Sequence, residues 1–293
     1  MKVLVYGASG SQASPVVSEL INQGHDVRAF SRDKAKAAPR IHPKAEIFEG
    51  DMLDFDATLK ASQGMEAIAL HIPTFMGNQY QAAQNAIKAA QNAGIKLIVW
   101  NASGVILPER IGNPTQDIRL DVKALLEESE IPNVILQPTV YAENLLGPWT
   151  APFVKEQAKV AYPTPADFEI AWLPSIDMAK LMVAALTKPE LVGKGFVISG
   201  KQNYSGLKLA KVFEEALGRP IEYYAMPPSE FGQILDSIMG PGAGAAIAKE
   251  YQAIWDGKAK PTMAVEMQAI LDLFEVEFTD LADWIKSYEK LFS

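Results

Sequence analysis

Two glycines near the start of the chain are the first residues whose type and spacing could do chemistry. Gly7 and Gly10 follow the apolar stretch Lys2 to Tyr6, which is typical of a buried strand. A pyrophosphate reaches the N–H groups of a helix N-terminus only where no side chain blocks its approach, and glycine leaves that approach open. Ala13 replaces the third glycine of the most familiar fingerprint and is still small enough for close packing of helix on strand. The segment predicts a dinucleotide site.

Glycines at this spacing also serve ordinary turns, so the surrounding pattern has to separate the two interpretations. Apolar residues at helical spacing follow the motif up to Gly24, and a second strand pattern runs from His25 to Phe30. The resulting β-α-β unit favours the dinucleotide interpretation.

The end of the second predicted strand, in the segment FSRDK, indicates which nicotinamide cofactor fits. An acidic side chain there accepts hydrogen bonds from ribose hydroxyls, whereas an arginine accommodates a 2′-phosphate. Arg32 favours NADP (NADPH) over NAD, because a guanidinium makes bidentate contacts with phosphate. In the alternative, Arg32 is an ordinary solvated residue and Asp33 binds the ribose.

The third predicted strand ends in the segment EGDMLD. There the Asp51 carboxylate can accept a hydrogen bond from the adenine amino group while Met52 packs on the ring. Alternatively Asp51 caps the local backbone, and the two roles are compatible.

The fourth predicted strand ends at His71, Ile72, Pro73 and Thr74, and strand order places these residues beside the cofactor's ribose and nicotinamide. His71 is a candidate for acid or base catalysis. A single histidine at a strand end is more often a structural residue.

The segment WNASG follows the fifth predicted strand and brings Asn101 and Ser103 to the same edge of the sheet. Either side chain can orient a substrate oxygen. Both can equally be turn residues, as asparagine and serine commonly are.

Lys123 is the best candidate for catalysis outside the glycine-rich turn, and it lies one helical turn after Arg119. Its ammonium can fix the nicotinamide ribose, and a nearby cation can lower its pKa enough for proton transfer. In the alternative, Lys123 is a solvated helix residue paired with Glu127.

The elements that must position these residues alternate between strand and helix through the first half of the chain. This alternation predicts an α/β fold with a doubly wound parallel sheet (Rossmann) and ligands at the carboxyl ends of its strands. The six predicted strands are Lys2 to Tyr6, His25 to Phe30, Glu46 to Glu49, Ala67 to Ile72, Lys96 to Asn101 and Val134 to Pro138.

The second half is less regular, with prolines and aromatic residues after about residue 145. We expect a NAD(P)-binding domain over 1–147, to which 175–200 returns. Residues 148–174 and 201–293 are expected to form a smaller, mostly helical substrate-binding region. Five aromatic residues can wall an apolar pocket there, although such aromatics are more often ordinary core: Trp149, Phe153, Tyr162, Phe168 and Trp172.

Composition narrows the function classes. The 293 residues carry a formal net charge of −8, which argues against general binding to nucleic acid or to an anionic membrane. There is no cysteine and there are only three histidines, so neither a disulfide nor a metal centre is expected. No apolar run approaches the roughly 18 residues of a membrane span, and we expect a cytoplasmic protein. The oligomeric state is left open, a homodimer included.

Taken together, GASGSQA, FSRD, EGD, NASG, ALLEESEIPNVILQPTVYAENLL and SIDMAKLMVAAL resemble the NmrA-like group of atypical short-chain dehydrogenases/reductases over nearly the whole chain. The resemblance implies Lys123 near the nicotinamide and a substrate cleft roofed by the C-terminal part, lined or supported by Tyr141, Glu143 and Asn144. It implies NAD(P) binding by Gly7, Ser9, Ser11, Gln12, Arg32 and Asp51.

One position departs from this family pattern. Short-chain dehydrogenases use Y-x-x-x-K, in which the tyrosine transfers the proton, and here the tyrosine position holds Arg119. A guanidinium cannot transfer a proton at neutral pH. Two hypotheses follow: an NADPH-dependent reductase of a small apolar quinone or carbonyl compound, or a non-catalytic NADP(H)-sensing regulator that acts through a protein partner.

Overall fold

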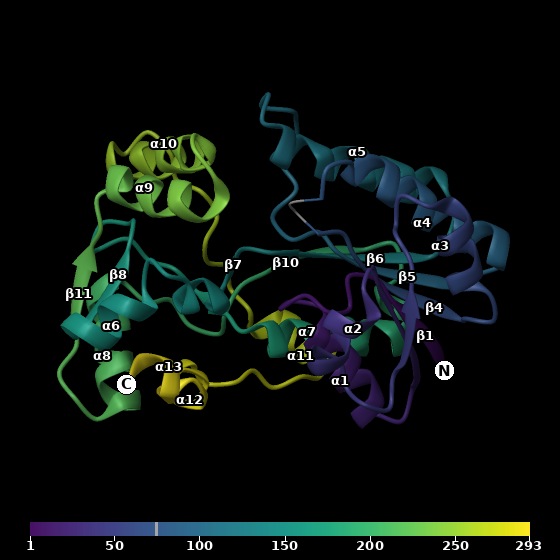
Figure 1. The fold of residues 1–293 in the computed structure, drawn as a ribbon, viewed down its shortest axis with the longest axis horizontal. Coiled ribbons are helices and arrows are strands. Elements are labelled where there is room, and N and C mark those ends of the chain that lie inside the picture. Colours follow the sequence, from purple (N-terminus) through teal and green to yellow (C-terminus); the bar gives the residue numbers. More distant parts are fainter. Residues whose placement is uncertain (74–75) are drawn as a thin grey trace. The chain divides into compact units, whose positions relative to one another are not determined.

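The computed structural model describes residues 1–73 and 76–293, and its chain divides into two compact units (Figure 1). The first unit comprises 1–139, 175–198 and 268–277, and the second comprises 140–174, 199–267 and 278–293. The first segment of the first unit ends at 139, whereas the expected segment ran to 147, and Val140 and Tyr141 pair with a strand of the second unit. It also includes 268–277, where Lys180 donates from Nζ to the Glu277 carbonyl at 2.8 Å.

The first unit is built on a seven-stranded sheet with the order β10-β6-β5-β4-β1-β2-β3, and every pair in it is parallel. The order reverses direction between β4 and β1, which is the switch point where such sheets bind ligands. This arrangement confirms the predicted doubly wound fold. The strands are β1 (Lys2–Val5), β2 (Asp26–Ser31), β3 (Glu46–Glu49), β4 (Ala67–His71), β5 (Leu97–Asn101), β6 (Asn133–Pro138) and β10 (Gly195–Ile198).

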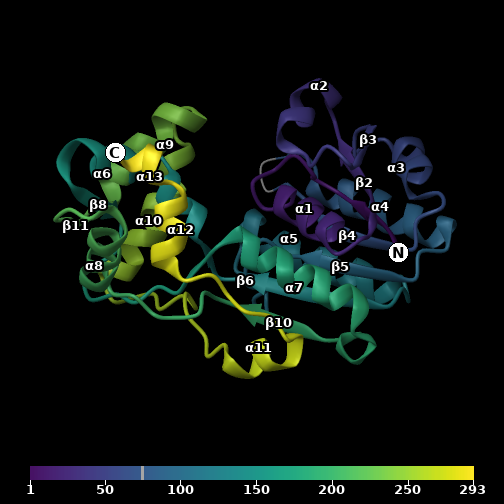
Figure 2. The same cartoon turned by 90° about the horizontal axis from the view of Figure 1, so that it is seen from below.

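Helices cover both faces of this sheet, as Figures 1 and 2 show. One face carries α3 (Phe55–Ser62), α4 (Gln79–Ala93) and α5 (Pro114–Glu128); the other carries α1 (Ser14–Asn22), α7 (Ser175–Thr187) and α11 (Gln268–Phe274). The short α2 (Lys34–Ala37) follows β2. The core under α3–α5 includes Leu4, Phe30, Ile68, Ile98 and Trp100.

Local signals fix where these helices begin and end. Asn78 caps α4 by accepting from the Gln81 backbone N–H, and Gly94 ends it in the left-handed conformation. Asn113 caps α5, and Pro114 occupies its first turn. The helix therefore begins at Pro114.

The second unit is mostly helical, as expected. Two pairs of short parallel strands accompany its helices, and none of these four strands was among the predicted ones. The strands are β7 (Val140–Tyr141), β8 (Lys159–Tyr162), β9 (Trp172–Leu173) and β11 (Glu222–Ala225). The helices are α6 (Ala151–Gln157), α8 (Gly206–Leu217), α9 (Pro228–Met239), α10 (Ala243–Trp255), α12 (Leu281–Ser287) and α13 (Glu289–Phe292).

Among residues 1–73 and 76–293, no helix combines the length and the apolar character that crossing a membrane requires. The same residues contain no cluster of three histidine, aspartate or glutamate side chains arranged for a metal ion.

Candidate functional site

The glycine-rich turn after β1 leads into α1 through a glycine in the left-handed conformation. Gly7 adopts a positive φ of 65°, and a Cβ there would lie 3.0 Å from the His71 carbonyl oxygen. The Gly10 N–H donates to the Gly7 carbonyl at 2.9 Å, and Ser14 donates to the Gly10 carbonyl at 2.9 Å to begin α1. Ala13 is buried against the sheet. The turn thus leads directly into the N-terminus of α1, and binding of a pyrophosphate there stays a prediction.

Side chains of this turn reach the neighbouring strand ends. The Ser9 hydroxyl lies 3.3 Å from the Ser31 hydroxyl at the end of β2. On the other side of β1, the Ser103 hydroxyl donates to Gln12 Oε1 at 3.5 Å. Ser11 is exposed. The structure therefore brings together residues from three predicted segments at one edge of the sheet.

The end of β2 separates the roles of Arg32 and Asp33. The Asp33 carboxylate accepts from the Lys36 backbone N–H at 3.0 Å and pairs with its ammonium at 3.2 Å, and these contacts lower the pKa of Asp33. Arg32 is exposed, and no ion pair of its guanidinium occurs within the described part of the chain. The cation is available to a ligand, whereas the carboxylate is already used as the cap of α2.

Asp51 and Met52 have local structural roles. Asp51 Oδ1 accepts from the Leu53 backbone N–H at 2.9 Å, as the capping alternative predicts. Met52 is only 4% exposed and packs in the core, while its carbonyl accepts from the Asn85 side chain at 2.9 Å. Contact of either residue with an adenine ring stays a prediction.

His71 is buried beneath the glycine-rich turn. Burial lowers the pKa of its imidazole to about 4, so the ring is neutral at physiological pH. Its Nδ1 atom has no hydrogen-bond partner among the described residues. The neutral ring lacks the positive charge of a general acid. Burying Nδ1 without a hydrogen bond costs free energy, which a bound water or ligand could recover by bonding to it. Ile72 is buried and Pro73 is half-buried beside it, while Thr74 lies outside the described residues.

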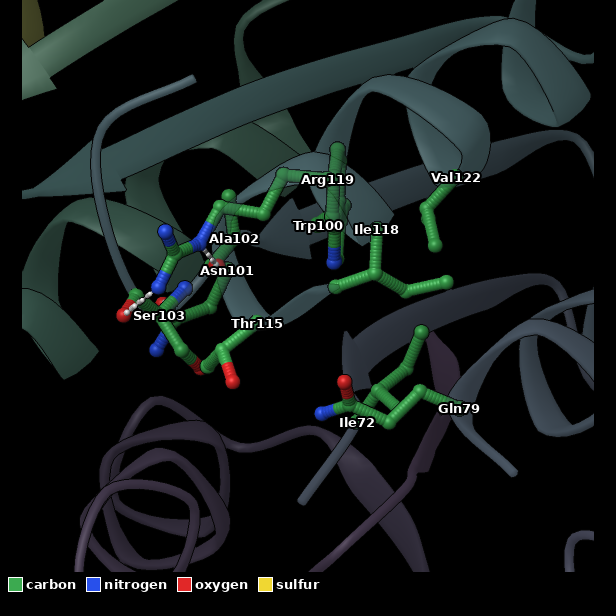
Figure 3. Close-up of a pocket in the computed structure, with 10 residues that line it drawn as sticks. All are labelled: Ile72, Gln79, Trp100, Asn101, Ala102, Ser103, Thr115, Ile118, Arg119 and Val122. Carbon is green, nitrogen blue, oxygen red and sulfur yellow. Dashed lines mark hydrogen bonds between the residues drawn. The ribbon is translucent and has the colours of Figure 1, made fainter. Parts of the chain in front are cut away.

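A small cavity lies beside the end of β5, lined by α4, α5 and the strand ends (Figure 3). The Asn101 side chain accepts a hydrogen bond from the Ser103 backbone N–H at 2.9 Å, so both residues contribute to a turn, as one of the two alternatives predicts. Arg119 bends over this turn and donates to the carbonyls of Ala102 at 3.1 Å and Ser103 at 3.2 Å. The ten lining residues are Ile72, Gln79, Trp100, Asn101, Ala102, Ser103, Thr115, Ile118, Arg119 and Val122.

This role of Arg119 was not predicted from the sequence, because a contact with Ala102 and Ser103 depends on tertiary structure. One usable signal was Gly104, directly after the turn, since its missing side chain makes room for the guanidinium.

Lys123 lies on α5 one turn beyond Arg119 and does not line this cavity. Its ammonium pairs with Glu127, as the structural alternative predicts, and its side chain is 41% exposed. A catalytic role for Lys123 stays a prediction.

The residues expected to line a substrate pocket all belong to the second unit. Trp149 packs edge-on against Phe231, and Phe153 stacks on Tyr224, so both contribute to a hydrophobic cluster there. Tyr141 is buried, and Asn144 hydrogen-bonds with Tyr162. These contacts are those of a core, and a role in binding substrate stays a prediction.

Comparison with known proteins finds a similar sequence and similar solved structures. An NAD(P)H azoreductase of Xenophilus azovorans is 27% identical over 254 residues, 86% of each chain. The crystal structure of the Escherichia coli NADPH-dependent quinone oxidoreductase QOR2 with NADPH has a TM-score of 0.79 at 22% identity and covers 98% of this chain and 99% of its own. The negative transcriptional regulator NmrA has a TM-score of 0.75 at 16% identity and covers 99% and 96%.

These structural likenesses concern the fold. A family model, described as the NmrA-like family, matches residues 1–285, which is almost the entire chain. The glycine-rich turn and the doubly wound sheet described above fall within that match, and the protein is therefore a member of the NmrA-like family.

Proposed function

We propose that the protein binds NADP(H) at the carboxyl edge of the sheet in the first unit and reduces a small apolar quinone or carbonyl compound. The observation that carries the proposal is the pair Arg32 and Asp33. The arginine is exposed at the end of β2, while the adjacent carboxylate caps α2, which favours a 2′-phosphate over a free ribose. The likeness to an NAD(P)H azoreductase supports the same chemistry.

The residues of this edge fit such a cofactor. The glycine-rich turn leads into the N-terminus of α1, Arg32 supplies a cation for the 2′-phosphate, and Asn101 and Ser103 lie on the β5 side. When bound, reduced nicotinamide supplies a hydride.

The reaction also needs a proton for the product. Of the described residues beside the Ser103 turn, Arg119 keeps its proton at neutral pH and the His71 ring is neutral. We therefore assign this protonation to Lys123 or to water. A quinone yields a phenolate that its ring stabilises, whereas a simple carbonyl yields a far more basic alkoxide. This difference favours quinones among the acceptors.

A panel of quinones and small carbonyl compounds, with NADPH oxidation followed by absorbance, tests the proposal. We expect turnover with at least one quinone. The rate of NADPH oxidation by Lys123→Ala tests whether Lys123 supplies the proton. Lys60→Ala, on the exposed surface of α3, is the matched control. Failure of every acceptor to exceed the background rate would count against a reductase.

The second candidate is a regulator that binds NADP(H) and signals to a protein partner without turnover. Arg119 at the tyrosine position favours it, as does the likeness to NmrA. Such a sensor has to bind the oxidised and reduced cofactors unequally, because equal affinities shift no equilibrium. Calorimetry with both forms separates the hypotheses: equal affinities together with turnover would exclude the sensor.

A further inference from the structure

Arg119 connects helix α5 to the loop that follows β5. Its Nε donates to the Ala102 carbonyl at 3.1 Å, and its Nη2 donates to the Ser103 carbonyl at 3.2 Å (Figure 3). Its Nη1 hydrogen-bonds with Gln116, one turn earlier on the same helix. The planar guanidinium thereby holds two successive carbonyls at once, which a lysine ammonium does less well.

The turn that Arg119 holds is conformationally strained. Ser103 has a φ of 54°, in the left-handed region that residues other than glycine rarely adopt. Its backbone N–H donates to Asn101 Oδ1, while its carbonyl accepts from Arg119. Strain of this kind persists where the surroundings impose it, and it is typical of functional sites.

Gly104 completes the arrangement. A Cβ at this position would lie 2.4 Å from Nη2 and 2.5 Å from Cζ of Arg119, which is too close for any real contact. The guanidinium occupies the space that a side chain at position 104 would need. Arg119 and Gly104 are therefore expected to be energetically coupled.

The turn at Ser103, which Arg119 holds, lies on the nicotinamide side of the proposed cofactor site. Strand order places the adenosine half of a dinucleotide toward β2 and the nicotinamide half toward β4 and β5. The Ser103 hydroxyl already reaches Gln12 of the glycine-rich turn at 3.5 Å. We propose that Arg119 is a positioning residue, which holds the Ser103 turn against the glycine-rich turn and so shapes the nicotinamide end of the site. This inference rests on the NADP(H) site of the proposed function.

The test compares two ligands by calorimetry, without any acceptor: NADPH, and 2′,5′-ADP, which lacks the nicotinamide half. Arg119→Ala is expected to weaken NADPH binding about tenfold, as the loss of one charge-assisted hydrogen bond would. The affinity for 2′,5′-ADP is expected to stay unchanged, because that ligand has no nicotinamide half to reach the Ser103 turn. Arg110→Ala is the matched control, since Arg110 pairs with Asp121 of α5 outside the cavity lining.

A double-mutant cycle adds a second readout. Gly104→Ala alone is expected to weaken NADPH binding, because the new methyl group displaces the guanidinium. In Gly104→Ala/Arg119→Ala that collision is gone, so the combined loss is expected to be smaller than the product of the two single losses.

Each outcome decides the inference. Equal NADPH affinity in wild type and Arg119→Ala overturns it. Equal losses of affinity for NADPH and 2′,5′-ADP in Arg119→Ala also overturn it, as does a loss in the double variant equal to the product of the two single losses. The reductase proposal survives all three results. A wild type that binds NADPH but reduces no acceptor contradicts only the reductase. A wild type that binds neither ligand overturns both.

Discussion

Replacing Gly7 by alanine tests the geometry of the glycine-rich turn, and Gly24→Ala is its matched control. Both glycines have a positive φ, 65° at Gly7 and 82° at Gly24, so both variants carry the left-handed penalty of about 1–2 kcal/mol. Only at Gly7 does the added Cβ meet backbone, 3.0 Å from the His71 carbonyl oxygen, and nothing lies within 4 Å of it at Gly24. The difference between the two variants isolates this close contact.

Overpacking of this kind costs about 1–3 kcal/mol, so Gly7→Ala is expected to unfold more easily than Gly24→Ala by that amount. Urea denaturation of the two variants measures the difference in the free energy of unfolding. Calorimetry with NADPH should show a loss of affinity for Gly7→Ala alone, because Gly24 lies at the opposite edge of the sheet, before β2 begins. Equal stability of the variants together with full NADPH affinity in Gly7→Ala would refute the reasoning.

Two further predictions concern titration and surface charge. The pKa of His71 is lowered from 6.5 to about 4 by burial, so the unfolded chain binds a proton in this window before the folded protein does. Stability attributable to His71 is therefore lost as the pH falls from about 6.5 to about 4, by up to about 3 kcal/mol. His71→Gln should show a flatter pH dependence of unfolding than wild type; parallel curves would exclude burial of a neutral imidazole. Lys123→Ala removes an exposed i,i+4 ion pair and should lower the free energy of unfolding by less than about 0.5 kcal/mol in urea denaturation, whatever it does to turnover. A loss several times larger would mean that Lys123 is held by more than Glu127.

The sheet was predictable from sequence because its strands are short apolar runs separated by helices that glycine or asparagine delimits, as at Gly94. The position of Gly7, Arg32 and Asn101 at one edge followed from the same alternation, since parallel strands present their carboxyl ends together.

The unit boundaries and the contacts of Arg119 were not predictable in this way. The two-residue strands β7 and β9 carry no periodicity, yet their pairing places residues 140–147 in the second unit. The hydrogen bonds from Arg119 to Ala102 and Ser103 join residues that lie 16 or 17 positions apart in the sequence. The turn that they hold contains Ser103 in the left-handed conformation, which no sequence pattern predicts. Whether an aromatic residue such as Trp149 lines a pocket or packs in a core also depends on its tertiary neighbours, here Phe231.

The measurement that tests the central claim most directly is a calorimetric titration of wild type and Arg32→Ala with NADPH and NADH. An exposed guanidinium on a 2′-phosphate contributes a charge-assisted contact, so NADPH is expected to bind wild type at least about tenfold more tightly than NADH. Arg32→Ala is expected to remove most of this preference by weakening NADPH alone. Lys34→Ala, two residues later at the start of α2, is expected to leave the preference in place. An unchanged preference in Arg32→Ala, or no binding of either cofactor to wild type, would contradict the account.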